Sequence, residues 1–400
     1  MVACLLIFLG VVVYWTRSDP ESSYQRGLAA MQRRDVPALH RELQILRRFP
    51  KYEPQVQLLR GAVFLAGQDY QAAVKEFDRC SVHPATRLFA LTLAGEALCR
   101  LDRQQAAIGV LQQALGFNPN YIPAHRSLAI AYYEVGSHDE AIAELRKVAE
   151  LDPADSRPHR LLGSIHKEDD RYAEAVQDYR ATLRLAPQQL SRQAVLLELS
   201  QSLVKLRRYT EALKFLDQAE LTANILACRA ACEFQLGHKS GARDAALKAV
   251  ELNPQHLEAL VWLGRIETEA GRLAPAAQYL ERAVKSHPID STARTQLAVV
   301  YKRQGKPQEA QAQVERIATN NKLREKLGQL QEQTKKRPQD ASLRYEMGET
   351  ARELQLYKLA RRCFQSALSL NPNLQKAQQA LEQLPAPDKS PSLTTELQKS

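Results

Sequence analysis

Proline residues recur along this chain at an interval of 34 residues. Pro119, Pro153 and Pro187 keep this spacing, and so do Pro254 and Pro288. The intervening segments are alike, as IPAHRSLAIAYYEVGSHDEAIAELRKVAELDP, SRPHRLLGSIHKEDDRYAEAVQDYRATLRLAP and LEALVWLGRIETEAGRLAPAAQYLERAVKSHP show. Self-similarity at this period is typical of repeat proteins, whose units stack because one unit cannot bury its apolar stripe alone.

Small and bulky residues also recur at fixed positions of each segment. A small residue stands in the middle of the first helical stretch at Gly95, Ala129, Gly163, Gly264 and Gly348. An alanine lies near the start of the second stretch at Ala107, Ala141, Ala175, Ala276 and Ala360. A bulky side chain follows four residues later at Leu111, Leu145, Tyr179, Leu280 and Phe364. Small residues let two helices approach closely, and a proline after the second helix ends it.

This pattern resembles the tetratricopeptide repeat, in which two antiparallel helices recur every 34 residues. The resemblance covers roughly residues 20–384 and implies an all-α, right-handed α-solenoid of about ten helix pairs. Strong helix formers such as Ala, Leu, Gln, Glu and Arg dominate the composition, which agrees with this class. Repeats 1 to 9 should occupy residues 20–320. The ten repeats are expected to begin near residues 20, 54, 88, 122, 156, 193, 223, 257, 291 and 341.

The last two repeats are separated by an insertion, which we assign to residues 321–340. Leucines recur there at helical spacing, at Leu323, Leu327 and Leu330. We expect an additional helix that packs on the array. Residues 341–384 should then form the final repeat and a capping helix, and the Pro- and Ser-rich tail of residues 385–400 should be disordered.

The formal net charge of +10 comes from 55 basic and 45 acidic residues. This balance favours acidic partners or an anionic membrane surface. No block of five or six like charges occurs, so we expect no nucleic-acid partner. The six cysteines lie far apart, mostly in apolar helical stretches, which is typical of buried thiols and not of a disulfide framework.

The first residues form an uncharged run, residues 2–15. As a helix this run would be about 21 Å long, shorter than a hydrocarbon core of about 30 Å. A signal peptide would need a basic residue before this run, and none is present. Tyr14 and Trp15 at the end of the run suit a membrane interface. We expect residues 1–16 to form a short hydrophobic helix that anchors the chain in a bacterial inner membrane, with Met1 as an internal start. The alternative is a cleaved signal peptide. The basic residues after the run indicate cytoplasmic repeats: Arg17, Arg26, Arg33 and Arg34.

Few side chains in the sequence suggest chemistry. His159 and His166 lie seven residues apart on one predicted helix, and Cys228 and Cys232 lie four apart on another. A metal site would need further ligands, and none is evident, so we interpret both pairs, and His125, as packing residues. No phosphate-binding loop, nucleophile elbow or zinc-protease motif is present. We therefore predict no metal, no cofactor and no enzymatic activity.

The resemblance implies a concave groove lined by a few positions of the first helix of each repeat. Mapping these positions onto two adjacent repeats gives Arg126, Tyr133, Arg157, Arg160 and Lys167. Arginine can bind a carboxylate through two parallel hydrogen bonds, so this set favours an acidic or carboxylate-bearing peptide. Some relatives bind a C-terminal carboxylate with Lys and Asn pairs, but Ile130 and Ser164 stand here where Asn would be needed. The alternative is that these are ordinary solvated charges.

These observations predict a non-enzymatic scaffold for protein–protein interaction, tethered to a membrane through residues 2–15. A partner peptide or helix would bind in the concave groove. An alternative is a recruiting or regulatory adaptor subunit of a membrane-associated enzyme complex. Self-association stays open, because the ends of helical repeat arrays often pair.

Overall fold

The computed structural model describes residues 19–188 and 191–385 of the chain. These residues form twenty-one α-helices and one short 3₁₀ turn, with no strand among them. The predicted all-α class is therefore confirmed. The helices divide into two compact units, α2–α11 and α12–α22, each described by itself.

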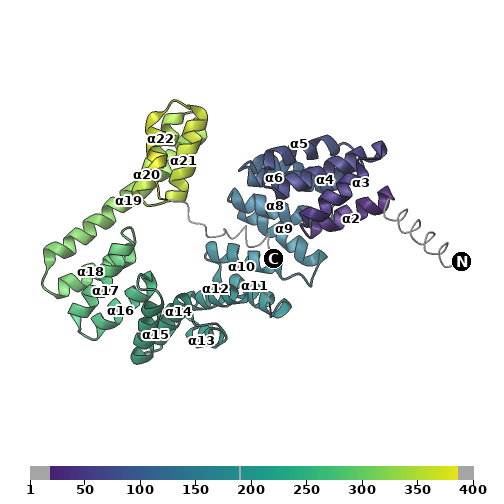
Figure 1. The fold of residues 1–400 in the computed structure, drawn as a ribbon. Helices are drawn as coiled ribbons and strands as arrows, with labels where there is room; N and C mark the ends of the chain where they lie inside the picture. Colours follow the sequence, from purple (N-terminus) through teal and green to yellow (C-terminus); the bar gives the residue numbers. More distant parts are fainter. Residues whose placement is uncertain (1–18, 189–190, 386–400) are drawn as a thin grey trace. The chain divides into compact units, whose positions relative to one another are not determined.

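The first unit is a stack of five helix pairs (Figure 1). We call the first helix of a pair helix A and the second helix B. The 3₁₀ turn η1 (Pro50–Tyr52) leads into the second pair. The helices are α2 (Pro20–Gln32), α3 (Val36–Leu46), α4 (Glu53–Ala66), α5 (Tyr70–Cys80), α6 (Arg87–Arg100), α7 (Gln104–Phe117), α8 (Ile122–Glu134), α9 (His138–Leu151), α10 (Arg157–Glu168) and α11 (Tyr172–Leu185).

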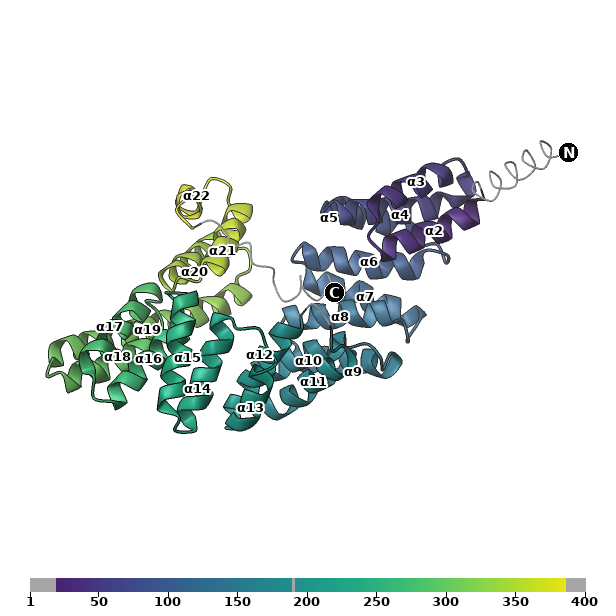
Figure 2. The same ribbon diagram turned by 60° about the horizontal axis from the view of Figure 1, so that its bottom comes forward.

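The second unit also consists of five pairs, followed by one last helix (Figure 2). Within it, each helix A packs on the helix B before it and on its own helix B. The helices are α12 (Arg192–Lys205), α13 (Tyr209–Leu216), α14 (Ala223–Gln235), α15 (Lys239–Leu252), α16 (Leu257–Glu269), α17 (Leu273–Ser286), α18 (Ser291–Arg303), α19 (Pro307–Lys336), α20 (Ala341–Glu353), α21 (Tyr357–Leu370) and α22 (Gln375–Glu382).

The turn from helix A to helix B contains one residue with positive φ in all ten described pairs. In four turns this residue is glycine, at Gly136, Gly237, Gly271 and Gly305. In the other six it carries a side chain, at Arg34, Gln68, Asp102, Asp170, Arg207 and Gln355. Because of the left-handed residue, the N–H of the following residue can donate a hydrogen bond to a carbonyl group near the end of helix A. The N–H of Ser137, for example, donates to the Tyr132 carbonyl at 2.9 Å. The chain thereby reverses direction and helix B can pack against helix A.

The small residue of helix A is required by a bulky side chain of helix B. In the pair α16–α17, a Cβ atom added at Gly264 would lie 2.4 Å from Cγ of Leu280. In the pair α10–α11, a Cβ atom at Gly163 would lie 2.7 Å from Cε1 of Tyr179. Leu280 and Tyr179 are fully buried, so neither can move away without disturbing the core.

We expect Gly264→Val to destabilise the second unit by about 2–3 kcal/mol, because the added methyl groups overpack the contact with Leu280. Gly109→Val is the matched control, since Gly109 lies inside α7 with no heavy atom within 4 Å of an added Cβ. Urea unfolding followed by circular dichroism measures both variants. Equal stability of the two would contradict this account of the glycine.

Helix α19 departs from the repeat pattern. It is one continuous helix of 30 residues that contains both the helix B of the ninth pair and most of the expected insertion at residues 321–340. In its second half, Leu327 and Leu330 are buried in one apolar cluster with Leu343 and Met347 of α20. At the other side of the last pair, Ala380 of α22 joins the same cluster, so α22 closes the end of the second unit.

The predicted localisation needs correction. Across residues 19–188 and 191–385, no helix combines the length and the apolar character needed to cross a bilayer. The expected anchor, residues 1–16, lies outside the described residues, and its uncharged run of about 21 Å is short for a hydrocarbon core of about 30 Å. A single-pass anchor is therefore not seen, and the inner-membrane and cytoplasmic assignments that depended on it are withdrawn. Residues 386–400 of the expected tail also lie outside the described residues.

Candidate functional site

The five predicted groove residues lie on two helices A of the first unit. Arg126 and Tyr133 belong to α8, and the other three, Arg157, Arg160 and Lys167, belong to α10. Helix α9 packs against both α8 and α10. The structure brings two of the five, Arg126 and Arg157, onto a shared partner and separates the others into different contacts.

Asp155, in the loop before α10, binds the two arginines together. Its Oδ2 atom lies 2.6 Å from Nη2 of Arg126, and its Oδ1 atom lies 2.8 Å from Nε of Arg157. The backbone N–H of Arg157 donates to the same Oδ1 at 3.0 Å. The Asp155 side chain is only 5% exposed, whereas those of Arg126 and Arg157 are 30% and 41% exposed.

The charge state of Asp155 follows from these contacts. Burial alone would raise the pKa of its carboxyl group, but the hydrogen bonds from Arg157 and the charge of Arg126 outweigh burial and hold this pKa below its ordinary value. Asp155 is therefore ionised at neutral pH. Two guanidinium groups contact one carboxylate, so the three side chains together carry one positive charge.

Tyr133 lies at the other end of α8. Its hydroxyl group donates to Oε1 of Glu168 on α10 at 2.7 Å, and its ring stacks on that of His138 at 5.6 Å between centroids. Burial and the hydrogen bond to Glu168 raise the pKa of the Tyr133 hydroxyl, so it stays protonated as a donor. His138 in turn contacts Asp169, which also binds Arg171. Tyr133 thus belongs to a network that ties α8 to α10.

Arg160 contributes less surface than the sequence suggested. The Arg160 residue is 4% exposed, and its carbonyl group accepts a hydrogen bond from the Ser164 hydroxyl at 3.2 Å. Lys167 is half-buried, and both residues make polar interactions within the chain. Arg160 is therefore closed to a ligand on this face, whereas Arg126, Tyr133, Arg157 and Lys167 each stay partly exposed.

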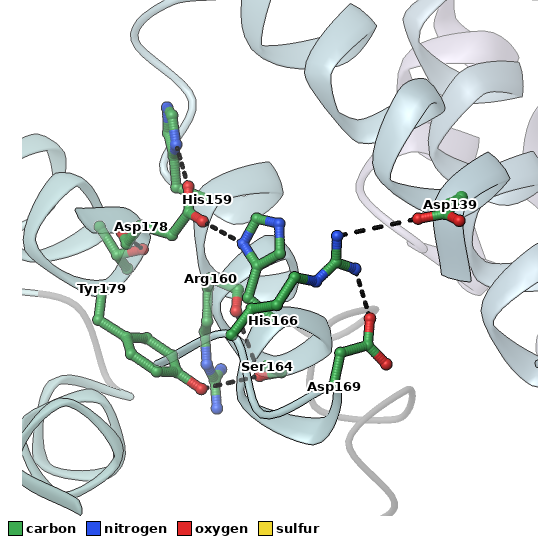
Figure 3. A network of polar contacts seen from close by, with 10 residues as sticks. Asp139, His159, Arg160, Ser164, His166, Asp169, Asp178 and Tyr179 are labelled. Atoms are coloured by element: carbon green, nitrogen blue, oxygen red, sulfur yellow. Dashed lines mark hydrogen bonds and ion pairs between the residues drawn. The ribbon is translucent and has the colours of Figure 1, made fainter. Parts of the chain in front are cut away.

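Sequence reasoning missed the carboxylates opposite the histidines. Figure 3 shows Asp178 of α11 between His159 and His166 of α10. Its oxygen atoms lie 3.4 Å from Nδ1 of His159 and 2.8 Å from Nδ1 of His166. One repeat earlier, His125 has Glu144 at 2.5 Å from its Nδ1 atom. Histidine and acid are 19 residues apart in both repeats, so this recurring spacing could have revealed the pairing.

The cysteines and the acidic side chains do not gather into a metal site in the part of the chain that the structure describes. Three cysteines, Cys80, Cys232 and Cys363, are buried, and burial raises the pKa of the Cys80 thiol to about 12. Within residues 19–188 and 191–385, no group of three or more His, Cys, Asp or Glu side chains is placed to hold a metal ion.

Comparisons with curated proteins give short matches. The peroxisomal targeting signal receptor of Kluyveromyces lactis is 27% identical over 124 residues, which are 31% of this chain and 21% of the receptor. The small glutamine-rich tetratricopeptide repeat-containing protein 2 of Mycosarcoma maydis is 30% identical over 82 residues, which are 20% of this chain and 23% of that protein. The chain thus spans less than a quarter of the length of these relatives.

Comparison with solved structures gives partial similarities. A tetratricopeptide repeat protein from Parabacteroides merdae has a TM-score of 0.45 at 16% identity, over 62% of this chain and 98% of its own. The pilus biogenesis factor PilW has a TM-score of 0.44 at 17% identity, over 50% of this chain and 93% of its own.

Family models described as tetratricopeptide repeat match more than half of the chain. One model matches residues 102–165 and 268–333, a second matches 233–291, and a third matches 161–189 and 341–374. These matches fall on the helix pairs whose small and bulky residues interlock. The chain belongs to the tetratricopeptide repeat family.

Proposed function

We propose that this chain is a non-enzymatic scaffold that binds an acidic peptide on the helix-A face of α8 and α10. Proteins of this family mediate protein–protein interaction and are typically not enzymes. One of the matched relatives is, by its name, a targeting signal receptor. The observation that carries the proposal is the excess positive charge where Arg126 and Arg157 share Asp155.

A carboxylate of the peptide would share the two guanidinium groups with Asp155. Each guanidinium has five N–H donors, and the contacts with Asp155 use one side-chain donor of each arginine. A second carboxylate can therefore bind without displacing the first. A charge-assisted hydrogen bond of this kind contributes about 1.5–3 kcal/mol.

Two substitutions with opposite expected effects test this proposal. The probe is a labelled, extended Asp- and Glu-rich peptide, with an Asn- and Gln-substituted peptide of equal length for comparison. We expect Arg157→Gln to weaken binding of the acidic peptide about tenfold, because one positive charge is lost. Asp155→Asn should strengthen binding severalfold, because the negative charge of Asp155, which repels the peptide carboxylate, is removed while both arginines remain.

The control is Arg146→Glu, on the exposed surface of α9, which should leave binding unchanged. Fluorescence anisotropy on the full chain gives the dissociation constants, and circular dichroism confirms that each variant is folded. If Asp155→Asn and Arg157→Gln weakened binding equally, the effect would be structural and the proposal would fail. Equal binding of the neutral peptide would also refute it.

A further inference from the structure

The helix B of each repeat has three positions that face the interior of the stack. In the pair α16–α17 these positions are Ala276, Leu280 and Ala283, and all three are fully buried. Helix α18, the helix A of the next pair, covers them: Leu280 clusters with Leu297 of α18. The same positions are fully buried in the final pair, whose end α22 covers: Ala360, Phe364 and Ala367.

The ninth pair, α18–α19, is the exception. Its three equivalent positions on α19 are Ala310, Val314 and Ile317. Val314 is 49% exposed, and Ala310 and Ile317 are only partly buried. We call these three residues the open face of α19.

The open face exists because α19 does not end where other helices B end. It continues for another four turns, and α20 packs on Leu327 and Leu330 in the second half of the helix. From Val314 to Leu327 the helix rises about 20 Å, at about 1.5 Å per residue. A helix with its side chains is about 10–12 Å wide, so this interval can hold one helix in the place that the next helix A takes elsewhere.

We propose that the open face of α19 binds an acidic amphipathic helix of a partner protein. We infer that the partner segment is a helix from the other repeats of the unit, where an amphipathic helix A covers the same positions. We infer that this partner helix is acidic from the residues around the open face, because residues 299–324 contain six basic and two acidic residues. A second copy of the chain fits less well, because its own net charge is +10. This surface belongs to the second unit and does not depend on the function proposed for α8 and α10.

The test uses a stapled helical peptide of about four turns, with leucines at i, i+3 and i+7 and glutamates on the other face. A second peptide replaces the glutamates by lysines. We expect the full chain to bind the acidic peptide, and Val314→Asp to weaken this binding at least about tenfold, which is about 1.4 kcal/mol. Val82→Asp is the matched control, since Val82 is an exposed valine in the first unit, and it should bind like the unchanged chain.

Other occupants of the open face give different results. A dimer in analytical ultracentrifugation that Val314→Asp dissociates would assign the face to a second copy and overturn the proposal. Tighter peptide binding after Leu393→Ser and Leu397→Ser would assign the face to the tail of the chain and likewise overturn it. Failure to bind the acidic peptide, or equal binding of the lysine peptide, would refute it. None of these outcomes bears on Asp155→Asn or Arg157→Gln.

Discussion

Tyr179→Ala should destabilise the first unit by about 3–5 kcal/mol, the range for truncating a buried aromatic side chain. Tyr179 is fully buried on Gly163, and its hydroxyl group donates to Oγ of Ser164 at 3.4 Å. Without the ring, the contact between α10 and α11 leaves a cavity that the surrounding helices fill only in part. Urea unfolding and amide hydrogen exchange measure the effect, with the largest loss of protection expected in α10 and α11.

The repeat supplies its own control for this experiment. Leucine occupies the equivalent position in several other pairs, for example at Leu111, Leu145 and Leu280. Tyr179→Leu should therefore lose less than half as much stability as Tyr179→Ala, because a side chain of suitable shape still covers Gly163. If both variants lost the same amount, the hydroxyl contact would matter more than the fit on Gly163, contrary to our account.

The second large effect is expected at Glu267 of α16, whose side chain is 1% exposed. Its Oε1 atom accepts from Nε of Arg243 at 2.7 Å, and its other oxygen contacts Arg272. Replacing both arginines by methionine leaves a buried carboxylate without a cation, which costs about 3–5 kcal/mol. Adding Glu267→Leu to that variant should restore most of the stability, because an apolar group of similar size replaces the charge. Thermal unfolding at neutral pH compares the stability of the unchanged chain, the double methionine variant and the triple variant.

The stability of the unchanged chain and that of the double methionine variant should depend on pH in opposite directions. Burial would raise the pKa of Glu267, but the hydrogen bonds from Arg272 and Arg243 outweigh it and hold the pKa below the ordinary value of 4.5. In the unchanged chain, the stability that Glu267 contributes is thus present above pH 4.5 and is lost as the pH falls through the lower folded-state value. In the double methionine variant burial acts alone, so stability should rise on acidification. Parallel pH profiles for the two proteins would contradict the assignment.

The helix pairs could be predicted from sequence because their determinants are local and repeated. Gly264 and Leu280 are 16 residues apart, as are Gly163 and Tyr179, and each contact closes within one repeat. The continuity of α19 could not be predicted in this way. The junction Asn320-Asn321 contains neither Pro nor Gly, so no local signal says whether the helix ends or continues there.

The candidate site was predictable only in part. Arg126 lies on α8 and Arg157 on α10, and the 34-residue period is enough to assign each of them to a helix A. Their shared partner, Asp155, lies in a loop between repeats, where no periodic pattern marks it. The burial of Arg160 depends on the packing of side chains around α10, which spacing alone does not specify.

The long helix α19 also affects how the second unit unfolds. In a stack of repeats, cooperativity comes from the apolar area buried between each pair and the next. The tenth pair does not cover the open face of the ninth pair, but buries its apolar side chains against Leu327 and Leu330 in the second half of α19. The last three helices and the second half of α19 therefore form one cooperative block, which can unfold at a lower denaturant concentration while the preceding pairs stay intact.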